Sequence, residues 1–335
     1  GVTYYLTYLA FNVNGVILLK AVTVTSAFYI LVKDSLRPYK NYLISVIVMT
    51  VVVLMTRHRF VERPDTFLMV FLSFSIFSLN AYIYDNKKYI YALPFVHMLW
   101  ANSHSSIALM FIPFSAVIFG SILNKFFNKR FSTDFAILSS TQLKTILIIF
   151  MASFAASLIN PYFMDQYFYG TQSLTGAVSK YYYGKQSLYT LWLRQSVMEL
   201  QRPTLQMIKW PYLMTGFVIF SFIININRKR FSMIHFLMVV PFIFLSFTAL
   251  RFVFLLGIAS GPVVARNFSI FVDSKSWKNI LSEKVPKVFV VFWIVLYTSL
   301  SAMQVKPFND PLKIFGLGTN YDPVPEGALK YMDKN

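Results

Sequence analysis

The chain has 335 residues, of which 56% are hydrophobic and 13% are charged. A soluble domain carries about 25% charged residues, so the composition excludes an ordinary soluble protein. The chain contains no cysteine, which excludes disulfide frameworks and thiolate metal sites. Its net charge of +18 does not indicate nucleic-acid binding, because most basic residues lie in short segments between apolar runs, as they do in multi-pass membrane proteins.

Apolar runs follow one another along the chain and predict an all-α, polytopic transmembrane helix bundle of about ten spans, since about 20 apolar residues in a helix cross the hydrocarbon core. The predicted spans are 15–32, 41–55, 66–84, 89–101, 106–123, 143–159, 210–226, 232–249, 252–265 and 288–303. Residues 4–13 are expected to form an interfacial segment or to extend the first span, and short interfacial helices are expected in the outer loops. We predict one transmembrane domain, 1–303, followed at 304–335 by the start of an extracytoplasmic segment or linker.

Lysine and arginine residues indicate the orientation of these spans. The loops after the first, third, fifth, seventh and ninth spans contain more than half of the 31 basic residues, including Arg37 and Arg266, so these loops are predicted to be cytoplasmic. The extracytoplasmic side then receives residues 56–65, 102–105 and 160–209, together with Arg251 and the tail from 304.

Five basic residues depart from this rule. They are Arg57, Arg59 and Arg63 in the stretch RHRFVERPDTF, Arg251 in LSFTALRFVFLL, and Lys20 inside the first apolar run. Charges at membrane depth are rare and often mark a functional site, and a guanidinium group binds two phosphate oxygens at once. We therefore predict that these residues bind a phosphate or pyrophosphate; the alternative is that they snorkel to lipid headgroups.

Other polar residues lie at the predicted outer ends of two spans. The stretch HMLWANSHSS contains Trp100, Asn102 and His104, and INPYF contains Asn160 and Tyr162. We predict that these residues line a sugar or acceptor site; the alternatives are a helix cap at His104 and an interfacial belt for the aromatic residues. The four histidines show no metal-ligand spacing, so no histidine metal site is predicted. A base that activates a hydroxyl on this face is expected among the acids nearest the arginines, which include Asp65 and Glu199.

The order and spacing of these motifs resemble bacterial multi-pass glycosyltransferases of the GT-C type, which take sugars from polyprenyl-phosphate donors. The matching stretches are RHRFVERPDTF, LWANSHSS, INPYF, VMELQRPT and TALRFVF, and they extend over nearly the whole chain. The tail GLGTNYDPVPEGALKYM resembles the linker into an extracytoplasmic domain in such proteins. The chain departs from the family at two points: Ser105 follows His104 where relatives have glycine, and Leu200 follows Glu199 where they have tryptophan.

The resemblance implies a hexosyl- or pentosyltransferase of the bacterial inner membrane, with an extracytoplasmic active face, that serves cell-envelope polysaccharide or glycoprotein biosynthesis. The implied partners are a polyprenyl-phosphate-linked sugar, membrane lipids and a glycan, lipid or protein acceptor, and some members use a divalent metal (Mg or Mn). The catalytic aspartate of such enzymes follows the first span. We therefore expect the main base upstream of Gly1 and interpret the chain as a fragment, with Asp65 and Glu199 as the remaining candidates.

Two other functions are alternatives to a transferase that uses the outer arginines. A polysaccharide polymerase or ligase acting on undecaprenyl-pyrophosphate glycans would combine them with a histidine. A transporter or flippase of a lipid-linked or anionic substrate would instead carry charges or helix breaks at mid-membrane, in paired positions of two repeats. No internal repeat is visible in the sequence, and the unusual charges are predicted to cluster at one face, which favours the enzymes. A purely structural membrane protein is the remaining alternative.

Overall fold

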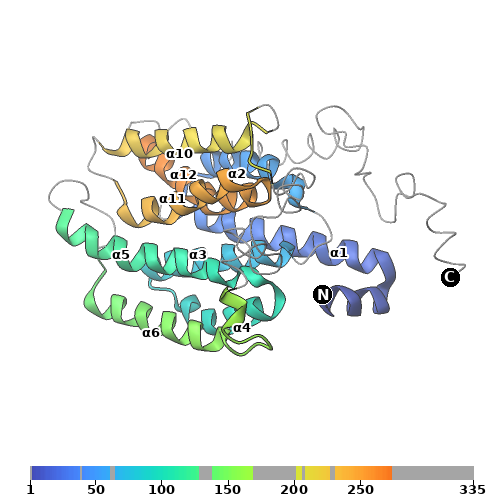
Figure 1. Cartoon of the computed structure of the whole chain (residues 1–335). Helices are drawn as coiled ribbons and strands as arrows, with labels where there is room; N and C mark the ends of the chain where they lie inside the picture. Colours follow the sequence, from blue (N-terminus) through green and yellow to red (C-terminus); the bar gives the residue numbers. More distant parts are fainter. Residues whose placement is uncertain are drawn as a thin grey trace, which may run out of the picture.

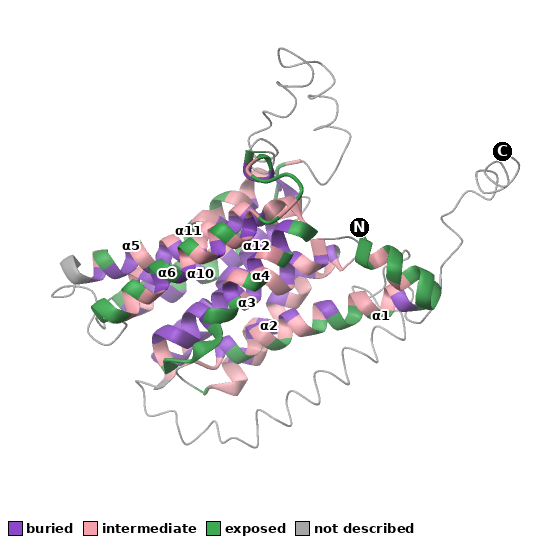
Figure 2. Cartoon of the chain, turned by 90° about the horizontal axis from the view of Figure 1, so that it is seen from below, coloured by how far each residue is buried: buried purple, intermediate pink, exposed green. Residues whose placement is uncertain are grey.

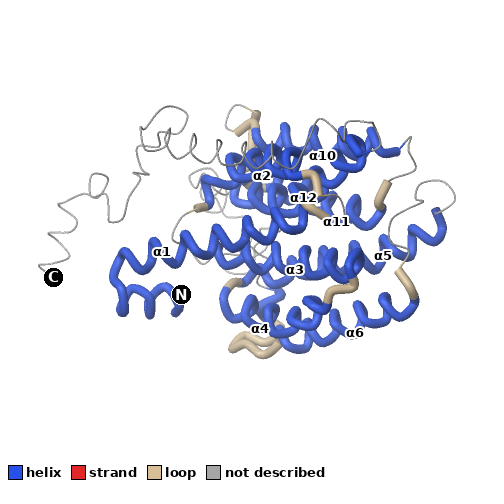
Figure 3. The backbone as a smooth tube through the Cα atoms, turned by 180° about the vertical axis from the view of Figure 1, so that it is seen from behind, coloured by secondary structure: helices blue, strands red, loops and turns tan. Residues whose placement is uncertain are grey.

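The chain is folded from helices throughout the part that the computed structural model describes (Figure 1). The described residues are 2–37, 40–60, 65–127, 138–168, 201–205, 208–226 and 231–273. Within these ranges the regular elements are α-helices and 3-10 helices, and no strand is present (Figure 3). The predicted span 288–303, the segment 304–335 and the candidate residues Arg63 and Glu199 lie outside the described residues.

The helices follow the apolar runs of the sequence. They are α1 (Val2–Ser35), α2 (Tyr42–Thr56), η1 (Arg57–Arg59), α3 (Asp65–Asp85), η2 (Lys88–Ala92), α4 (Leu93–Ser103), η3 (Ser105–Met110), α5 (Phe111–Phe127), α6 (Ser140–Ser157), α10 (Trp210–Ile226), α11 (Met233–Thr248), η5 (Leu250–Phe252) and α12 (Val253–Asp273). Five helical segments are long and apolar enough to cross a membrane: α1, α3, η3 with α5, α6, and η5 with α12. The helices α2, α10 and α11 have 15, 17 and 16 residues, fewer than the roughly 20 of an untilted crossing, so the count of ten spans stays a prediction.

A kink at Asn12 divides α1 into two parts. The backbone of Asn12 has φ 53° and ψ −155°, and a positive φ is more accessible to asparagine than to most other residues. The segment before the kink turns back beside the rest of α1 (Figure 1). Its Tyr4 hydroxyl lies 2.6 Å from the Thr66 hydroxyl, and its ring packs edge-on against Phe67. The predicted interfacial segment is therefore a helix that contacts the start of α3.

The helices α3 and α12 form the centre of the bundle. The apolar stretch of α12 is 94% buried and that of α3 is 78% buried, whereas those of α1 and α6 are 22% buried. Figure 2 shows the same contrast, with α12 mostly buried and α1 mostly intermediate or exposed. Large apolar side chains on the outer helices, such as Leu18 and Met151, are exposed, which suits contact with lipid tails that are as apolar as leucine.

Glycines allow α12 and α5 to approach their neighbours closely. Gly257 and Gly261 lie one turn apart on α12 and face α2, where an added Cβ would come within 2.9 Å of Thr56 and 2.8 Å of a valine side chain. Small residues four positions apart are a common device for close helix contact in membranes. Gly120 on α5 is tighter, because an added Cβ would lie 2.7 Å from the Cα of Ile234 on α11.

Gly120→Ala is expected to lower the free energy of unfolding by about 1–3 kcal/mol, because the backbone of α11 would have to move. Gly216→Ala in α10 is the matched control, since a Cβ added there meets nothing within 4 Å. Alanine favours a helix over glycine by about 0.5–1 kcal/mol, so the control is expected to hold or gain stability. Thermal unfolding of both variants in detergent measures the difference, and equal shifts would contradict the close contact of α5 with α11.

Candidate functional site

A polar cluster lies at one end of the bundle, where α2 ends and α3 begins. The 3-10 helix η1 follows α2 directly and carries Arg59, which is only 4% exposed. Asp65 is the first residue of α3, where an acidic side chain interacts favourably with the helix dipole. A guanidinium nitrogen of Arg59 forms an ion pair with Asp65 Oδ2. The stretch RHRFVERPDTF therefore joins its second arginine to its own aspartate.

His104 contributes the second partner of Asp65. It ends α4 and begins η3, and its Nδ1 accepts a hydrogen bond from the backbone N–H of Ser106 at 3.1 Å. Since Nδ1 is an acceptor, the ring proton of the neutral imidazole is on Nε2. Nε2 lies 3.1 Å from Asp65 Oδ1 and donates to it. The sequence left a helix cap and a site residue as alternatives for His104. In the structure His104 caps η3 and also contacts Asp65.

Arg251 is close enough to His104 for its charge to act on the imidazole. Its 3-10 helix, η5, leads into α12, and the Arg59 guanidinium lies 5.7 Å from the ring of Phe254 in the first turn of α12. Burial, together with the positive charges of Arg59 and Arg251, lowers the pKa of His104 to about 4. Two arginines from distant parts of the chain therefore act on one neutral imidazole.

The lowered pKa of His104 predicts a pH-dependent stability. The unfolded chain, with an ordinary histidine pKa of 6.5, binds the proton more readily than the fold does. The contribution of neutral His104 is thus fully present above about pH 6.5 and is lost as the pH falls toward 4. Between pH 7 and pH 5 the free energy of unfolding of the wild-type protein is expected to fall by about 2 kcal/mol more than that of the His104→Asn variant. Unfolding of both proteins in detergent across this pH range measures the difference. Equal changes of stability with pH in the two proteins would contradict the prediction.

Trp100 supports this cluster from the core. Its side chain is fully buried and stacks on Phe71 with ring centroids 5.9 Å apart. Its indole N–H donates to the Ser106 hydroxyl at 3.0 Å, and that hydroxyl lies 2.8 Å from His104 Nδ1. Trp100 was predicted to line a sugar or acceptor site; in the structure Ser106 links it to His104, so that it helps to position the imidazole.

The other predicted sugar-lining residues lie in the neighbouring turns. Asn102 donates to the carbonyl oxygen of Ile159 at 2.7 Å, which joins the end of α4 to the end of α6. Asn160 accepts from the backbone N–H of Tyr162 at 2.8 Å, and Tyr162 is 67% exposed. Of the other predicted phosphate-binding residues, Arg57 begins η1, two positions before Arg59, and Lys20 lies on α1. The structure therefore brings together Arg59, Asp65, His104 and Trp100, with Arg251 beside them.

The described residues do not fit a divalent metal at this cluster. Asp65 is its one carboxylate in the described part of the chain, and both of its oxygens are bound to Arg59 and His104. No group of three or more histidine, aspartate or glutamate side chains in the described ranges is arranged to hold a metal ion.

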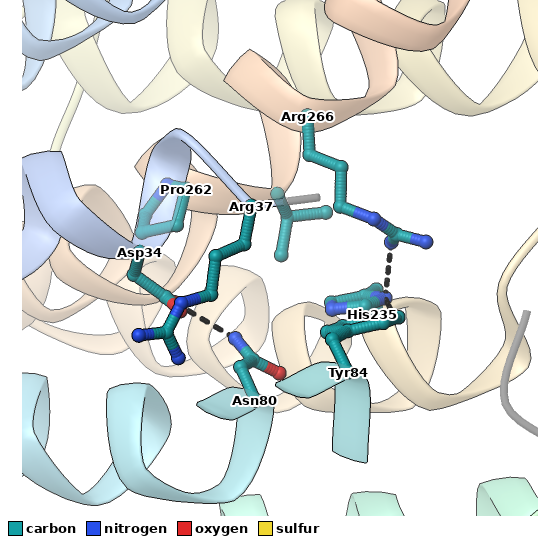
Figure 4. A pocket seen from close by; sticks show the side chains of 8 residues that line it. Asp34, Arg37, Asn80, Tyr84, His235, Pro262 and Arg266 are labelled. Atoms are coloured by element: carbon teal, nitrogen blue, oxygen red, sulfur yellow. Dashed lines mark hydrogen bonds between the residues drawn. The ribbon is translucent and has the colours of Figure 1, made fainter. Parts of the chain in front are cut away.

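A second polar cluster lies at the opposite end of the bundle, where α1 and α3 end (Figure 4). Asp34 is 3% exposed and accepts a hydrogen bond from Asn80 Nδ2 at 2.8 Å. Arg37 forms an ion pair with Asp85 at 3.1 Å, and its guanidinium lies over the ring of Phe77. The helices α1 and α3 are thus joined at this end by a hydrogen bond and an ion pair.

Arg266 on α12 and His235 on α11 complete this second cluster. The Arg266 side chain donates to His235 Nδ1 at 2.5 Å, and the ring of Tyr84 stacks on the imidazole (Figure 4). Because arginine can only donate, Nδ1 of His235 accepts and the imidazole is neutral. The cavity between these side chains has a volume of about 10 Å³, which is room for about one water molecule.

The sequence did not predict this second cluster. It assigned Arg266 to a cytoplasmic loop after a span ending at 265, which is wrong, because α12 continues to Asp273 and Arg266 is a helical residue with 3% exposure. Buried charges therefore lie at both ends of the bundle, and not only beside the arginines that the sequence singled out. A usable signal was present in Asn80, a polar residue in the middle of an otherwise apolar run.

Comparison with known proteins gives no family for this chain: no protein-family model, no curated protein and no solved structure matches it.

Proposed function

We propose that the chain is a membrane glycosyltransferase of the GT-C kind, which transfers a sugar from a polyprenyl-phosphate donor to an acceptor on the extracytoplasmic face of a bacterial inner membrane. The observation that carries the proposal is the cluster at the start of α3. There Arg59 and His104 both bind Asp65, and the charge of Arg251 acts on His104. Two cations, a carboxylate and a neutral hydrogen-bond donor are the groups that transfer from a phosphate requires.

The proposed reaction is a single displacement at the sugar carbon. The oxygen of an acceptor hydroxyl forms a bond to the anomeric carbon while the bond from that carbon to the phosphate oxygen breaks, which inverts the configuration. The hydroxyl proton passes to the Asp65 carboxylate, and polyprenyl phosphate leaves with the electron pair of the broken bond. Arg59 and Arg251 offset the negative charge that develops on the departing phosphate.

Asp65 is better suited than His104 to accept the proton. Nδ1 of His104 is occupied by Ser106, and Nε2 already carries a proton that it donates to Asp65. His104 therefore holds the carboxylate in place without adding a charge. Arg59 is paired with Asp65 in the structure, so we expect the donor phosphate to take over this guanidinium and to leave one carboxylate oxygen for the acceptor.

Donor binding is expected to depend on Arg251. Arg251→Gln is predicted to weaken the affinity for undecaprenyl phosphate by roughly 10- to 100-fold, the usual effect of removing a hydrogen bond between charged groups. Arg202→Gln is the matched control, because Arg202 is exposed and lies next to Gln201, whose carbonyl oxygen accepts from the backbone N–H of Leu250 at 2.8 Å. Native mass spectrometry in detergent measures both affinities. Equal losses for the two variants would overturn the assignment.

A transporter or flippase of an anionic or lipid-linked substrate is the second candidate, and one observation favours it. Arg266 is buried within α12, far along the bundle from Arg59, and charged side chains inside membrane-spanning helices often mark substrate or ion pathways. Proteoliposomes that contain the protein discriminate the two functions. Transfer of a labelled sugar from its lipid donor supports the enzyme, whereas movement of the lipid-linked sugar between leaflets without transfer supports the flippase.

A further inference from the structure

A polar cavity lies at the end of α3 that is remote from Asp65. Its volume is about 420 Å³, and it lies between the end of α3, the 3-10 helix η2 and the first turns of α6. This volume falls within the range of small-molecule sites, about 300–1,000 Å³. Tyr82 on its wall is 17 residues beyond Asp65 on the same helix, which corresponds to roughly 25 Å. The cavity is therefore separate from the proposed transfer site.

The side chains that line this cavity have one chemistry in common. They are phenols, amides, aliphatic hydroxyls and one ammonium group, and none of the lining residues in the described chain is acidic. The ammonium group belongs to Lys88, and the hydroxyl donors include Tyr91 and Thr141. All of these groups can donate a hydrogen bond, and one is cationic. Such a surface suits an anion that also carries hydroxyl groups.

Tyr82 gives the cavity a hydrogen-bonding group at its inner wall. The side chain is 6% exposed and its ring lies in the hydrophobic core, yet it also lines the cavity. Its hydroxyl has no hydrogen-bond partner among the residues that the structure describes. The hydroxyl is accessible from the cavity and can therefore form a hydrogen bond with a ligand or with solvent there.

We propose that this cavity binds a phosphate ester that carries hydroxyl groups, with Lys88 at the phosphate and the Tyr82 hydroxyl hydrogen-bonded to the same ligand. The glycerol phosphate headgroup of an anionic lipid and a soluble glycerol or sugar phosphate share this chemistry. The orientation predicted from the sequence puts this end of the bundle at the cytoplasmic leaflet, where basic side chains meet anionic headgroups. The proposal is independent of sugar transfer at Asp65.

The chain offers a matched pair of lysines for the test. Both Lys87 and Lys88 are exposed, but only Lys88 lines the cavity. Lys88→Gln and Lys87→Gln remove the same charge from adjacent positions. Tyr82→Phe keeps the buried ring and removes only the hydroxyl. Thermal unfolding of each variant first establishes that the fold is retained.

The experiment is native mass spectrometry of the purified protein with phosphatidylglycerol, phosphatidylcholine and free glycerol 3-phosphate. We expect phosphatidylglycerol to bind more tightly than phosphatidylcholine. Lys88→Gln and Tyr82→Phe are each expected to weaken the affinity for phosphatidylglycerol about tenfold, whereas Lys87→Gln is expected to leave this affinity unchanged. Competition by glycerol 3-phosphate would support a soluble ligand, and its absence a lipid headgroup. Equal effects of the two lysine variants, no effect of Tyr82→Phe, or no preference for either anionic probe would overturn the proposal.

Discussion

Asp65→Asn is expected to reduce sugar transfer by about 100- to 10,000-fold, the usual contribution of a positioned general base. Asparagine has nearly the same shape as aspartate but cannot accept the proton of an acceptor hydroxyl. The substitution also removes a negative charge that is paired with Arg59. The affinity for undecaprenyl phosphate is therefore expected to stay the same or to increase while turnover is lost.

This opposite behaviour of binding and turnover is what separates a catalytic role from a structural one. Turnover is measured as release of undecaprenyl phosphate from a labelled lipid-linked sugar in membranes that contain the acceptor. Asp165→Asn is the matched control, because Asp165 is an exposed aspartate in the turn after α6, and its rate is expected to stay within about twofold of wild type. If Asp65→Asn kept the wild-type rate, or lost binding and turnover together with stability, Asp65 would be a structural partner of Arg59 and the proposed reaction would fail.

The helices were predictable from the sequence because hydrocarbon leaves few alternatives. Backbone groups in a membrane must bond within their own segment, so an apolar run of sufficient length becomes a helix whatever its neighbours are. The predicted span 210–226 matches α10, and the predicted span 66–84 falls inside α3. Helix ends were less predictable where a polar residue continues a helix, as Arg266 does in α12.

The polar clusters were only partly predictable, because their contacts join residues far apart in the chain. Charge counting singled out Arg59, Arg251 and Asp65, but not the hydrogen bond from His104 to Asp65, which spans 39 positions. The rule that puts basic residues on the cytoplasmic side also concealed the second cluster. It gave Arg37 a sufficient reason to lie in a loop, so nothing in the sequence indicated that Asn80 and Asp34 meet beside it.

Asp34→Ala is expected to lower the free energy of unfolding by about 3–5 kcal/mol, the usual effect of removing one partner from a buried group of charges. Asn80 would lose its acceptor, and the positive charges of Arg37 and Arg266 that act on this carboxylate would lose their counter-charge. Asp85→Ala is the matched control within the same cluster. The Asp85 side chain is 37% exposed, and an exposed ion pair contributes about 0–1 kcal/mol.

Asp34→Asn separates charge from hydrogen bonding at this position, because asparagine keeps an acceptor for Asn80 but carries no charge. If the counter-charge dominates, Asp34→Asn is expected to be about as destabilising as Asp34→Ala; if it were as mild as Asp85→Ala, the buried charges would contribute little.

The same variant tests whether α12 links the two clusters. Arg251 precedes α12 and Arg266 lies 15 residues further on, roughly 22 Å along one helix. If Asp34 and its partners fix the position of that helix, Asp34→Asn should also weaken undecaprenyl phosphate binding at the remote end, whereas unchanged binding would show that the two ends act independently.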